Sequence, residues 1–157
     1  MHILYCKKWW FMKKKPIDIL DEDAARNNHL NGNDYTAVLS QNDKISHIIE
    51  FSKNDILVGF MNDNQDKYLT YAFSKKTEED IFLYVAYYHN YEAEKETEVI
   101  IFSFEEDGRL YMEKTNLISG ESEERENVTD VSCNWEKFPE FGKYSGLIKL
   151  ERDKDVT

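Results

Sequence analysis

The feature that most constrains the fold of this chain is a succession of short aromatic and β-branched segments separated by turn-forming residues. Turns are indicated at Gln41-Asn42-Asp43, Lys53-Asn54-Asp55 and Glu106-Asp107-Gly108, because Asn, Asp and Gly tolerate the backbone conformations of tight turns. No helical crossover, which parallel pairing requires, separates the segments. The sequence therefore predicts a mainly β protein with an antiparallel meander of about eight strands, forming a barrel or strongly curved sheet. The expected strands are residues 35–40, 44–52, 56–61, 68–74, 81–91, 97–104, 110–115 and 128–135.

The N-terminal residues 1–15 contain five lysines and no acid, and we expect them to form a basic strand or arm. Three interpretations remain open for this arm. Its lysines guard an exposed apolar edge, it lies against the acidic body of the protein, or it binds membrane or nucleic acid, since Lys flanks Trp9-Trp10-Phe11. A net charge of −11 favours the first two, because it repels anionic lipid and phosphate.

Irregular or helical segments are expected on both sides of the meander. Residues 17–26, after Pro16, predict a short helix with Asp18 as its N-cap. Residues 134–144 are dense in aromatic side chains and interrupted by Pro and Gly, which favours a plug that pins the last strand over a partner-binding loop. Polar loops are expected over residues 27–34 and 119–127, and residues 153–157 are expected to fray.

Length and composition indicate one domain, residues 1–157, that buries a sizeable core. The longest useful apolar run, residues 81–88, is far too short for a membrane span. No secretory signal pattern begins the chain, so we expect a cytoplasmic protein. In that compartment Cys6 and Cys133 are expected as free thiols, with a single bridge between them as the alternative.

The strand expected at residues 81–91 is apolar on both faces, with mainly aliphatic residues alternating with mainly aromatic ones. Such a sheet needs a cover on its second side, and we expect the chain itself to provide it. The residues expected on one face are Ile81, Leu83, Val85 and Tyr87, and those expected on the other are Phe82, Tyr84, Ala86 and Tyr88.

Signatures of chemistry are missing from the sequence. The histidines lack the spacing of zinc ligands, and the glycines are scattered rather than gathered in a phosphate-binding loop. Glu50 is the acid whose position hints at burial, but its alternation with Ser46 favours a polar face. His47 is expected at a half-buried core position. We therefore expect no enzyme activity, no metal and no cofactor.

Acidic side chains dominate residues 78–126, where fifteen Asp and Glu face four Lys and Arg. Because this acid lies among strands rather than in a tail, it predicts a shaped surface for a basic protein partner, with no direct contact to nucleic acid or membrane. The candidate partner-binding residues are the acids of two expected turns and two aromatic anchors, namely Glu92, Glu94, Glu96, Glu98, Glu105, Glu106, Asp107, Tyr88 and Tyr91.

In size, acidity and lack of catalytic motifs the whole chain resembles the immunity proteins of bacterial toxin–immunity systems of the contact-dependent-inhibition type. Those are small, acidic, cytoplasmic antitoxins of very diverse fold that bind a secreted nuclease domain. The resemblance implies a tight complex in which Asp and Glu side chains block the toxin. An alternative function is a small-molecule carrier of the lipocalin or fatty-acid-binding type, since a closed meander can enclose an apolar ligand.

Overall fold

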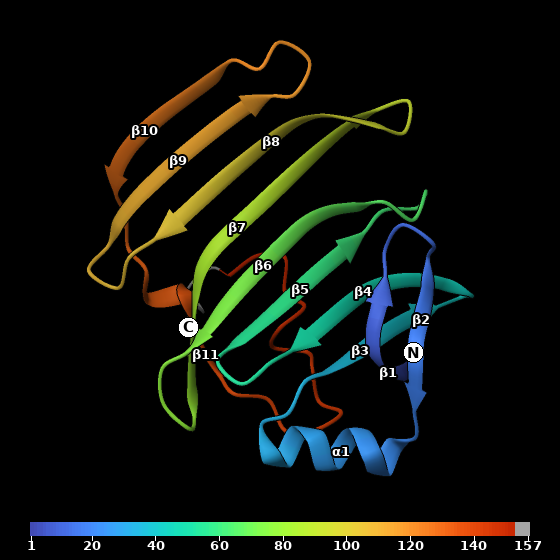
Figure 1. Ribbon diagram of the computed structural model, residues 1–157. Helices are drawn as coiled ribbons and strands as arrows, with labels where there is room; N and C mark the ends of the chain where they lie inside the picture. The colour runs from blue at the N-terminus through green and yellow to red at the C-terminus, as the bar shows by residue number, and fades with distance from the viewer. Residues whose placement is uncertain (153–157) are drawn as a thin grey trace.

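One antiparallel sheet runs through the described part of the chain, residues 1–152, in the computed structural model (Figure 1). Its order is β10-β9-β8-β7-β6-β5-β4-β3-β1-β2, and β11 pairs with the first residues of β7. The strands are β1 (His2–Trp10), β2 (Lys15–Leu20), β3 (Tyr35–Gln41), β4 (Lys44–Phe51), β5 (Asp55–Met61), β6 (Lys67–Lys75), β7 (Asp80–Glu92), β8 (Lys95–Phe104), β9 (Arg109–Asn116), β10 (Ser122–Val128) and β11 (Trp135–Lys137). The expected fraying of residues 153–157 lies outside the described residues.

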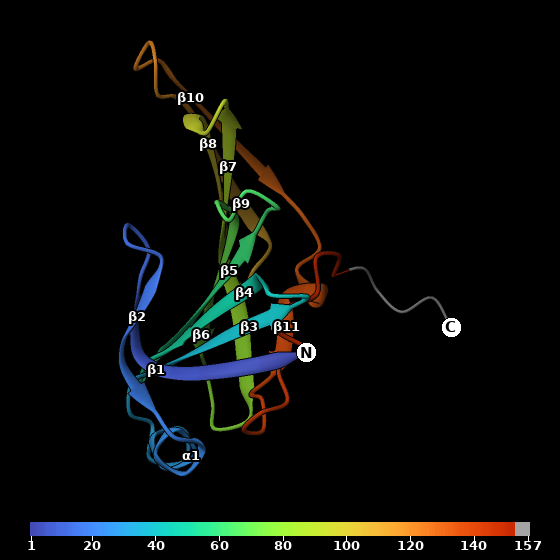
Figure 2. The ribbon, with the colours of Figure 1, turned by 90° about the vertical axis from the view of Figure 1, so that its right-hand side faces the viewer.

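The mainly β class and the antiparallel meander are confirmed, but residues 1–152 contain eleven strands rather than about eight. The sheet is also not closed into a barrel. Closure would require β10 to pair with β2, and these two strands are instead the edges of the sheet. The strands rotate strongly from one edge to the other, so that β1 crosses the direction of β7 (Figure 2).

The N-terminal helix lies later in the chain than the sequence indicated. Residues 15–20 form β2, and the helix α1 spans Glu22–Asn31. Asp21, not Asp18, is its N-cap, and its Oδ1 accepts a hydrogen bond from the Ala24 N–H at 2.7 Å. The expected loop at 27–34 is therefore mostly helix. No described helix has the length and apolarity needed to cross a membrane.

Two polar segments of the acidic half also form strands. Residues 122–127 were expected as part of a loop, but with Val128 they form β10, which pairs with β9 along its whole length. Residues 128–135 were expected as one strand, but they contain the short 3-10 helix η1 (Ser132–Asn134). After η1, the three residues of β11 pair with β7. Alternation of charged residues at an exposed edge gives no hydrophobic signal, which explains why β10 was missed.

The main core lies on one face of the sheet, which we call the inner face because the C-terminal segment and α1 cover it. From the C-terminal segment, Tyr144 and Leu147 are buried and Phe138 and Phe141 pack beside them. This confirms the expected plug, which covers the inner face of the sheet. The fully buried side chains at the centre of this core include Tyr35, Leu39, Ile49, Ile56, Phe60, Leu69, Phe73 and Ile81.

A β-bulge changes which residues of β7 share a face. Leu83 pairs with Phe73 and Val85 pairs with Ala72, so Tyr84 is an extra residue opposite the neighbouring strand. As a result Val85 and Tyr87 face away from Ile81 and Leu83, which corrects the strict alternation expected from the sequence. We call the face that carries Val85 and Tyr87 the outer face.

A second buried cluster lies on the outer face, near the N-terminal edge. Trp9 and Cys6 form this cluster with Val38 and Ile48, and Phe11 packs against it. Burial raises the pKa of the Cys6 thiol to about 11, and both cysteines are free. The turn of the β1–β2 hairpin projects beside this face (Figure 2). Strands β9 and β10 contribute no residue to either buried cluster, so the acidic end of the sheet is the less covered end.

Candidate functional site

The acids of the two predicted turns do not form one site. The β7–β8 turn carries Glu92 and Glu94, whereas the β8–β9 turn carries Glu105, Glu106 and Asp107. These turns lie at opposite ends of β8, which has ten residues and therefore spans roughly 33 Å.

Within the first group, a bulge separates Glu96 from Glu98. Asn90 pairs with Glu98 and Tyr91 pairs with Glu96, so the two glutamates point to opposite faces. On the outer face Glu96 contacts His89, with 2.5 Å between Oε1 and Nδ1. On the inner face Glu98 accepts a hydrogen bond from Asn90 Nδ2 at 2.9 Å and lies 3.5 Å from Lys114 Nζ.

The two predicted aromatic anchors also lie on opposite faces. Tyr88 shares the inner face with Phe102, and their rings meet edge to face at 5.6 Å. Tyr91 lies on the outer face, where its hydroxyl donates to the Lys67 carbonyl oxygen at 2.8 Å and burial raises its pKa. A partner that binds to one face of the sheet can therefore contact only one of these two tyrosines.

In the second group, two of the three acids already have cationic neighbours. Glu106 lies 3.3 Å from Lys76, and Asp107 lies 2.9 Å from Arg109. Hydrogen bonds from the Arg109 backbone N–H and guanidinium lower the pKa of the Asp107 carboxyl. This turn therefore presents less free charge than its sequence indicates.

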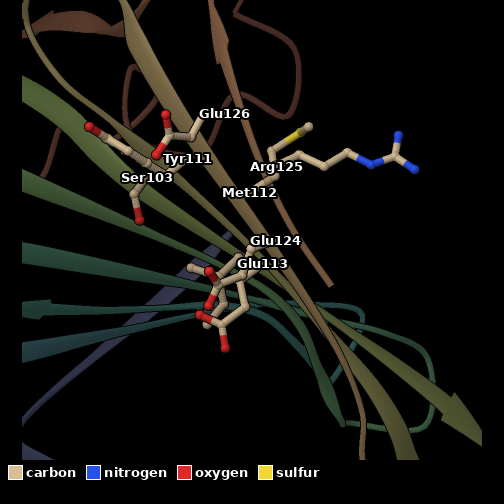
Figure 3. A pocket seen from close by; sticks show the side chains of 8 residues that line it. Ser103, Tyr111, Met112, Glu113, Glu124, Arg125 and Glu126 are labelled. Atoms are coloured by element: carbon tan, nitrogen blue, oxygen red, sulfur yellow. The ribbon is translucent and has the colours of Figure 1, made fainter. Parts of the chain in front are cut away.

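A more concentrated acidic site lies on the outer face of β8, β9 and β10, where a surface hollow measures about 440 Å³. Two rows of side chains cross these three strands. One row is Ile101, Glu113 and Glu124, and the next is Ser103, Tyr111 and Glu126. We call these six residues the acidic hollow. Figure 3 shows Arg125 pointing away from Ser103 and Glu126, consistent with its place on the other face.

The carboxylates of the acidic hollow have almost no partners in the part of the chain that the structure describes. Glu113 accepts only a long hydrogen bond from Thr115 Oγ1, at 3.5 Å, and Glu124 and Glu126 have no ion pair. Glu113 and Glu124 stand directly opposite each other across the strands. Like charges at such positions destabilise a sheet, so this arrangement costs stability in the free protein.

The acidic hollow has the chemistry to hold a cationic side chain. Tyr111 is 36% exposed and offers a ring face for cation–π contact, and Ile101 gives an apolar floor. Two carboxylates beside an aromatic ring suit a guanidinium, which pairs with carboxylates in a fork geometry. No group of three or more His, Cys, Asp and Glu among residues 1–152 is arranged to hold a metal ion.

The acids of β9 and β10 were not selected from the sequence, although they belong to the same acidic segment. A pairing of β9 with β10 in the present register would have placed Glu113 beside Glu124. The signal was hidden because residues 119–127 read as a loop.

Other ionisable groups with unusual surroundings lie outside the acidic hollow. Glu50 is half-buried on β4, where burial raises the pKa of its carboxyl despite nearby Lys67 and Lys8. His47 is half-buried, as expected, and burial lowers its pKa. His29, for which the sequence predicted no role, is half-buried and contacts Tyr35 and the C-terminal segment.

Comparisons with models of protein families, with curated proteins and with solved structures find no match to this chain. Functional assignment therefore depends on the site itself.

Proposed function

We propose that this protein binds a basic protein partner through the acidic hollow. The observation that supports the proposal is the set of three carboxylates, Glu113, Glu124 and Glu126, that surround Tyr111 and form no ion pair among residues 1–152. They are carried by paired strands rather than by a loop, so their spacing is fixed before binding. Such preorganisation reduces the entropy lost on association.

An incoming arginine or lysine would relieve the repulsion between Glu113 and Glu124. In the free protein the two carboxylates repel each other across the strands, whereas in the complex both attract the cation bound between them. This difference favours a cationic partner over a neutral one. The turns that carry Glu92, Glu94 and Glu105 add negative charge around the hollow. Charge at a rim mainly increases the association rate, so these acids act as steering residues rather than as anchors.

We further propose that the partner is a toxin nuclease domain and that this protein is its immunity protein. A nuclease binds phosphates with basic residues, and carboxylates on a rigid surface imitate phosphates in sign and spacing. The acidity and size of the chain agree with this role. Neutralisation would follow from occupation of the basic cleft by the acidic end of the sheet.

The carrier function has less support in this fold. A lipocalin-type carrier encloses its ligand inside a closed barrel, whereas β10 and β2 are unpaired edges here. The inner face of β3 to β7 is filled by aromatic side chains and covered by the C-terminal segment.

The test takes as candidate partner the product of the gene immediately upstream in the native genome, provided that this product is a basic protein. We expect the purified full-length chain to bind it, to protect cells that express it, and to lose affinity steeply as NaCl is raised. Replacing Glu113, Glu124 and Glu126 together by Gln should weaken binding at least about 100-fold, because each lost charge pair is worth roughly 1.5 kcal/mol or more.

The matched control replaces three exposed acids elsewhere, Glu78, Glu79 and Glu140, by Gln. This control makes the same change of net charge and should bind within about threefold of the original protein. Equal weakening by both triple variants would show that net charge, and not the acidic hollow, determines binding. Absence of a complex would refute the proposed partner.

A further inference from the structure

The β1–β2 hairpin presents a second surface of opposite character to the acidic hollow. Its turn joins Trp10 to Lys15, and these two residues pair with each other. Met12 is 90% exposed and Trp10 is 40% exposed. Lys13, Lys14 and Lys15 surround them, and the first acid of the chain is Asp18. We call residues 10–15 the hairpin tip.

The residues next to the hairpin tip pack into a buried cluster, which fixes the position of the tip. Trp9 is buried in the second cluster with Cys6, Val38 and Ile48, and Phe11 packs against that cluster. The Lys67 ammonium lies 4.2 Å from the centre of the Phe11 ring. The exposed apolar side chains of the tip are therefore fixed at the surface rather than carried by a loose terminus.

The lysines of the hairpin tip are not neutralised by the acidic body, which was one interpretation of the N-terminal arm. Lys13, Lys14 and Lys15 have no ion pair with any residue among 1–152. Lys13 and Lys15 instead place their ammonium groups 5.6 and 5.4 Å from the centre of the Trp10 ring. Asp66 is the acid that lines the hollow beside the tip, together with Lys14, Lys67 and mainly apolar side chains.

We propose that the hairpin tip binds the surface of an anionic lipid bilayer. Exposed Trp and aliphatic side chains with lysines on both sides are suited to the boundary between headgroups and acyl chains. Met12 enters the acyl boundary, Trp10 lies at headgroup level and the three lysines contact lipid phosphates or carboxylates.

Chemistry at the hairpin tip favours lipid over nucleic acid. The tip has no arginine, which reads bases and stacks on them more often than lysine does. Two lysine ammonium groups already lie against the Trp10 ring, which leaves it a poor platform for a base. The most exposed apolar group is the flexible Met12 chain, which cannot stack.

The overall negative charge does not prevent this contact at close range. Strands β9 and β10, which carry the acids of the acidic hollow, are at least seven strand spacings from β1 in the order of the sheet, or roughly 34 Å along the sheet. The end of β7 is nearer, because Tyr91 lines the same hollow as Lys14. The Debye length at physiological salt is about 8 Å, so the charge of β9 and β10 is largely screened at the tip.

Vesicle sedimentation with the full-length chain tests the proposal. The probes are vesicles of phosphatidylcholine with about one third phosphatidylserine, vesicles of phosphatidylcholine alone and a single-stranded oligonucleotide. We expect binding to the mixed vesicles, with a blue shift of Trp fluorescence that Trp10→Phe reduces. Replacing Lys13, Lys14 and Lys15 by Gln should lower the partition coefficient roughly 100-fold, and Met12→Ser should lower it without changing the net charge.

The matched control replaces Lys44, Lys53 and Lys95 by Gln, three exposed lysines outside the hairpin. The partition coefficient of this variant should stay within about twofold of that of the original protein, once the general effect of the lower net charge is allowed for. The proposal is overturned if the mixed vesicles are not bound, if both triple variants lose binding equally, or if the tip lysines are required for the oligonucleotide but not for the vesicles. Near-UV circular dichroism of each variant verifies that the fold is retained.

Discussion

At the scale of single residues, Glu50 carries the clearest electrostatic cost in the described fold. Its carboxyl is half-buried, and burial raises its pKa more than Lys67 and Lys8 lower it. The folded state therefore holds the proton more tightly than the unfolded state. The resulting stabilisation is complete below the unfolded-state pKa and is lost as the pH rises through the folded-state pKa.

We expect Glu50→Gln to raise the free energy of unfolding at pH 7 by on the order of 1 kcal/mol, because an amide avoids the desolvation of a charge. Near pH 4 the variant and the original protein should differ little. Urea denaturation at both pH values measures this, and Glu78→Gln, at an exposed position, serves as control. Lower stability of Glu50→Gln at pH 7 would contradict the assigned burial.

His29 gives the opposite dependence on pH. Its Nε2–H donates to the Pro139 carbonyl oxygen at 2.9 Å, so neutral His29 accepts the Tyr35 hydroxyl at Nδ1, over 2.8 Å. Burial lowers the pKa of the ring. The unfolded state then binds the proton more readily, and stability is lost as the pH falls from about 6.5 through the folded-state pKa.

Replacing His29 by Gln tests this assignment. The variant should lose roughly 1–3 kcal/mol at pH 7.5, because the carbonyl of Pro139 and the hydroxyl of Tyr35 lose well-placed partners. Between pH 7.5 and 5 its stability should fall less than that of the original protein, with His47 supplying the remaining dependence. Parallel stability curves across this range would show that His29 does not titrate with folding.

At the scale of elements, two hairpin turns share one geometry but differ in how well their residues suit it. Asn42 and Asp43 have φ of 53° and 60°, and Ala93 and Glu94 have φ of 47° and 68°. Asn and Asp tolerate the left-handed region, whereas Ala does not. We expect Ala93→Gly to raise the free energy of unfolding by roughly 0.5–1 kcal/mol. Asn42→Gly is the control and should gain less, as thermal unfolding of both variants will show.

The C-terminal segment is fixed by Arg152, whose side chain is 9% exposed. Its guanidinium donates to Glu136 Oε2 at 2.7 Å and to the carbonyl oxygens of Gly146 and Cys133. Arg152→Met should destabilise the protein by about 3 kcal/mol, because it leaves a partly buried carboxylate short of its main partner. Lys149→Met removes the exposed partner of the same carboxylate, at 3.5 Å, and should cost less than about 0.5 kcal/mol. Equal losses would show that Arg152 has no special role.

Elements with a strong pattern of apolar residues were predictable, and those without one were not. The segments that became β3 to β9 alternate or run apolar between clear turns, and each pairs with its neighbour in chain order. The edge strands β2 and β10 lack that pattern, since an edge strand needs no apolar face to form. Pro16 also suggested a break in the chain, although proline is tolerated in an edge strand.

At the scale of the whole molecule, the mainly β class followed from turn chemistry, but the candidate site depended on register. A single-residue bulge in β8 places Glu96 and Glu98 on opposite faces of the sheet. Sequence spacing alone assigns such pairs to one face, because the period of a strand is two. Acidity was therefore predictable, whereas the convergence of Glu113, Glu124 and Glu126 required the paired strands.

The open sheet leaves two edges that differ in their protection against self-association. The β2 edge contains Pro16 and a positive φ of 53° at Asp18, both of which obstruct pairing with another strand. The β10 edge has seven exposed residues and no proline, so its carboxylates are its main protection.

We expect a monomer at pH 7 and self-association when Glu123, Glu124 and Glu126 are replaced by Gln, measured by sedimentation velocity at increasing concentration. Replacing Glu92, Glu94 and Glu105 by Gln changes the net charge equally but leaves the edge charged, so that variant should stay monomeric. Association of both variants would assign the effect to net charge, and association of neither would show that backbone geometry already protects β10.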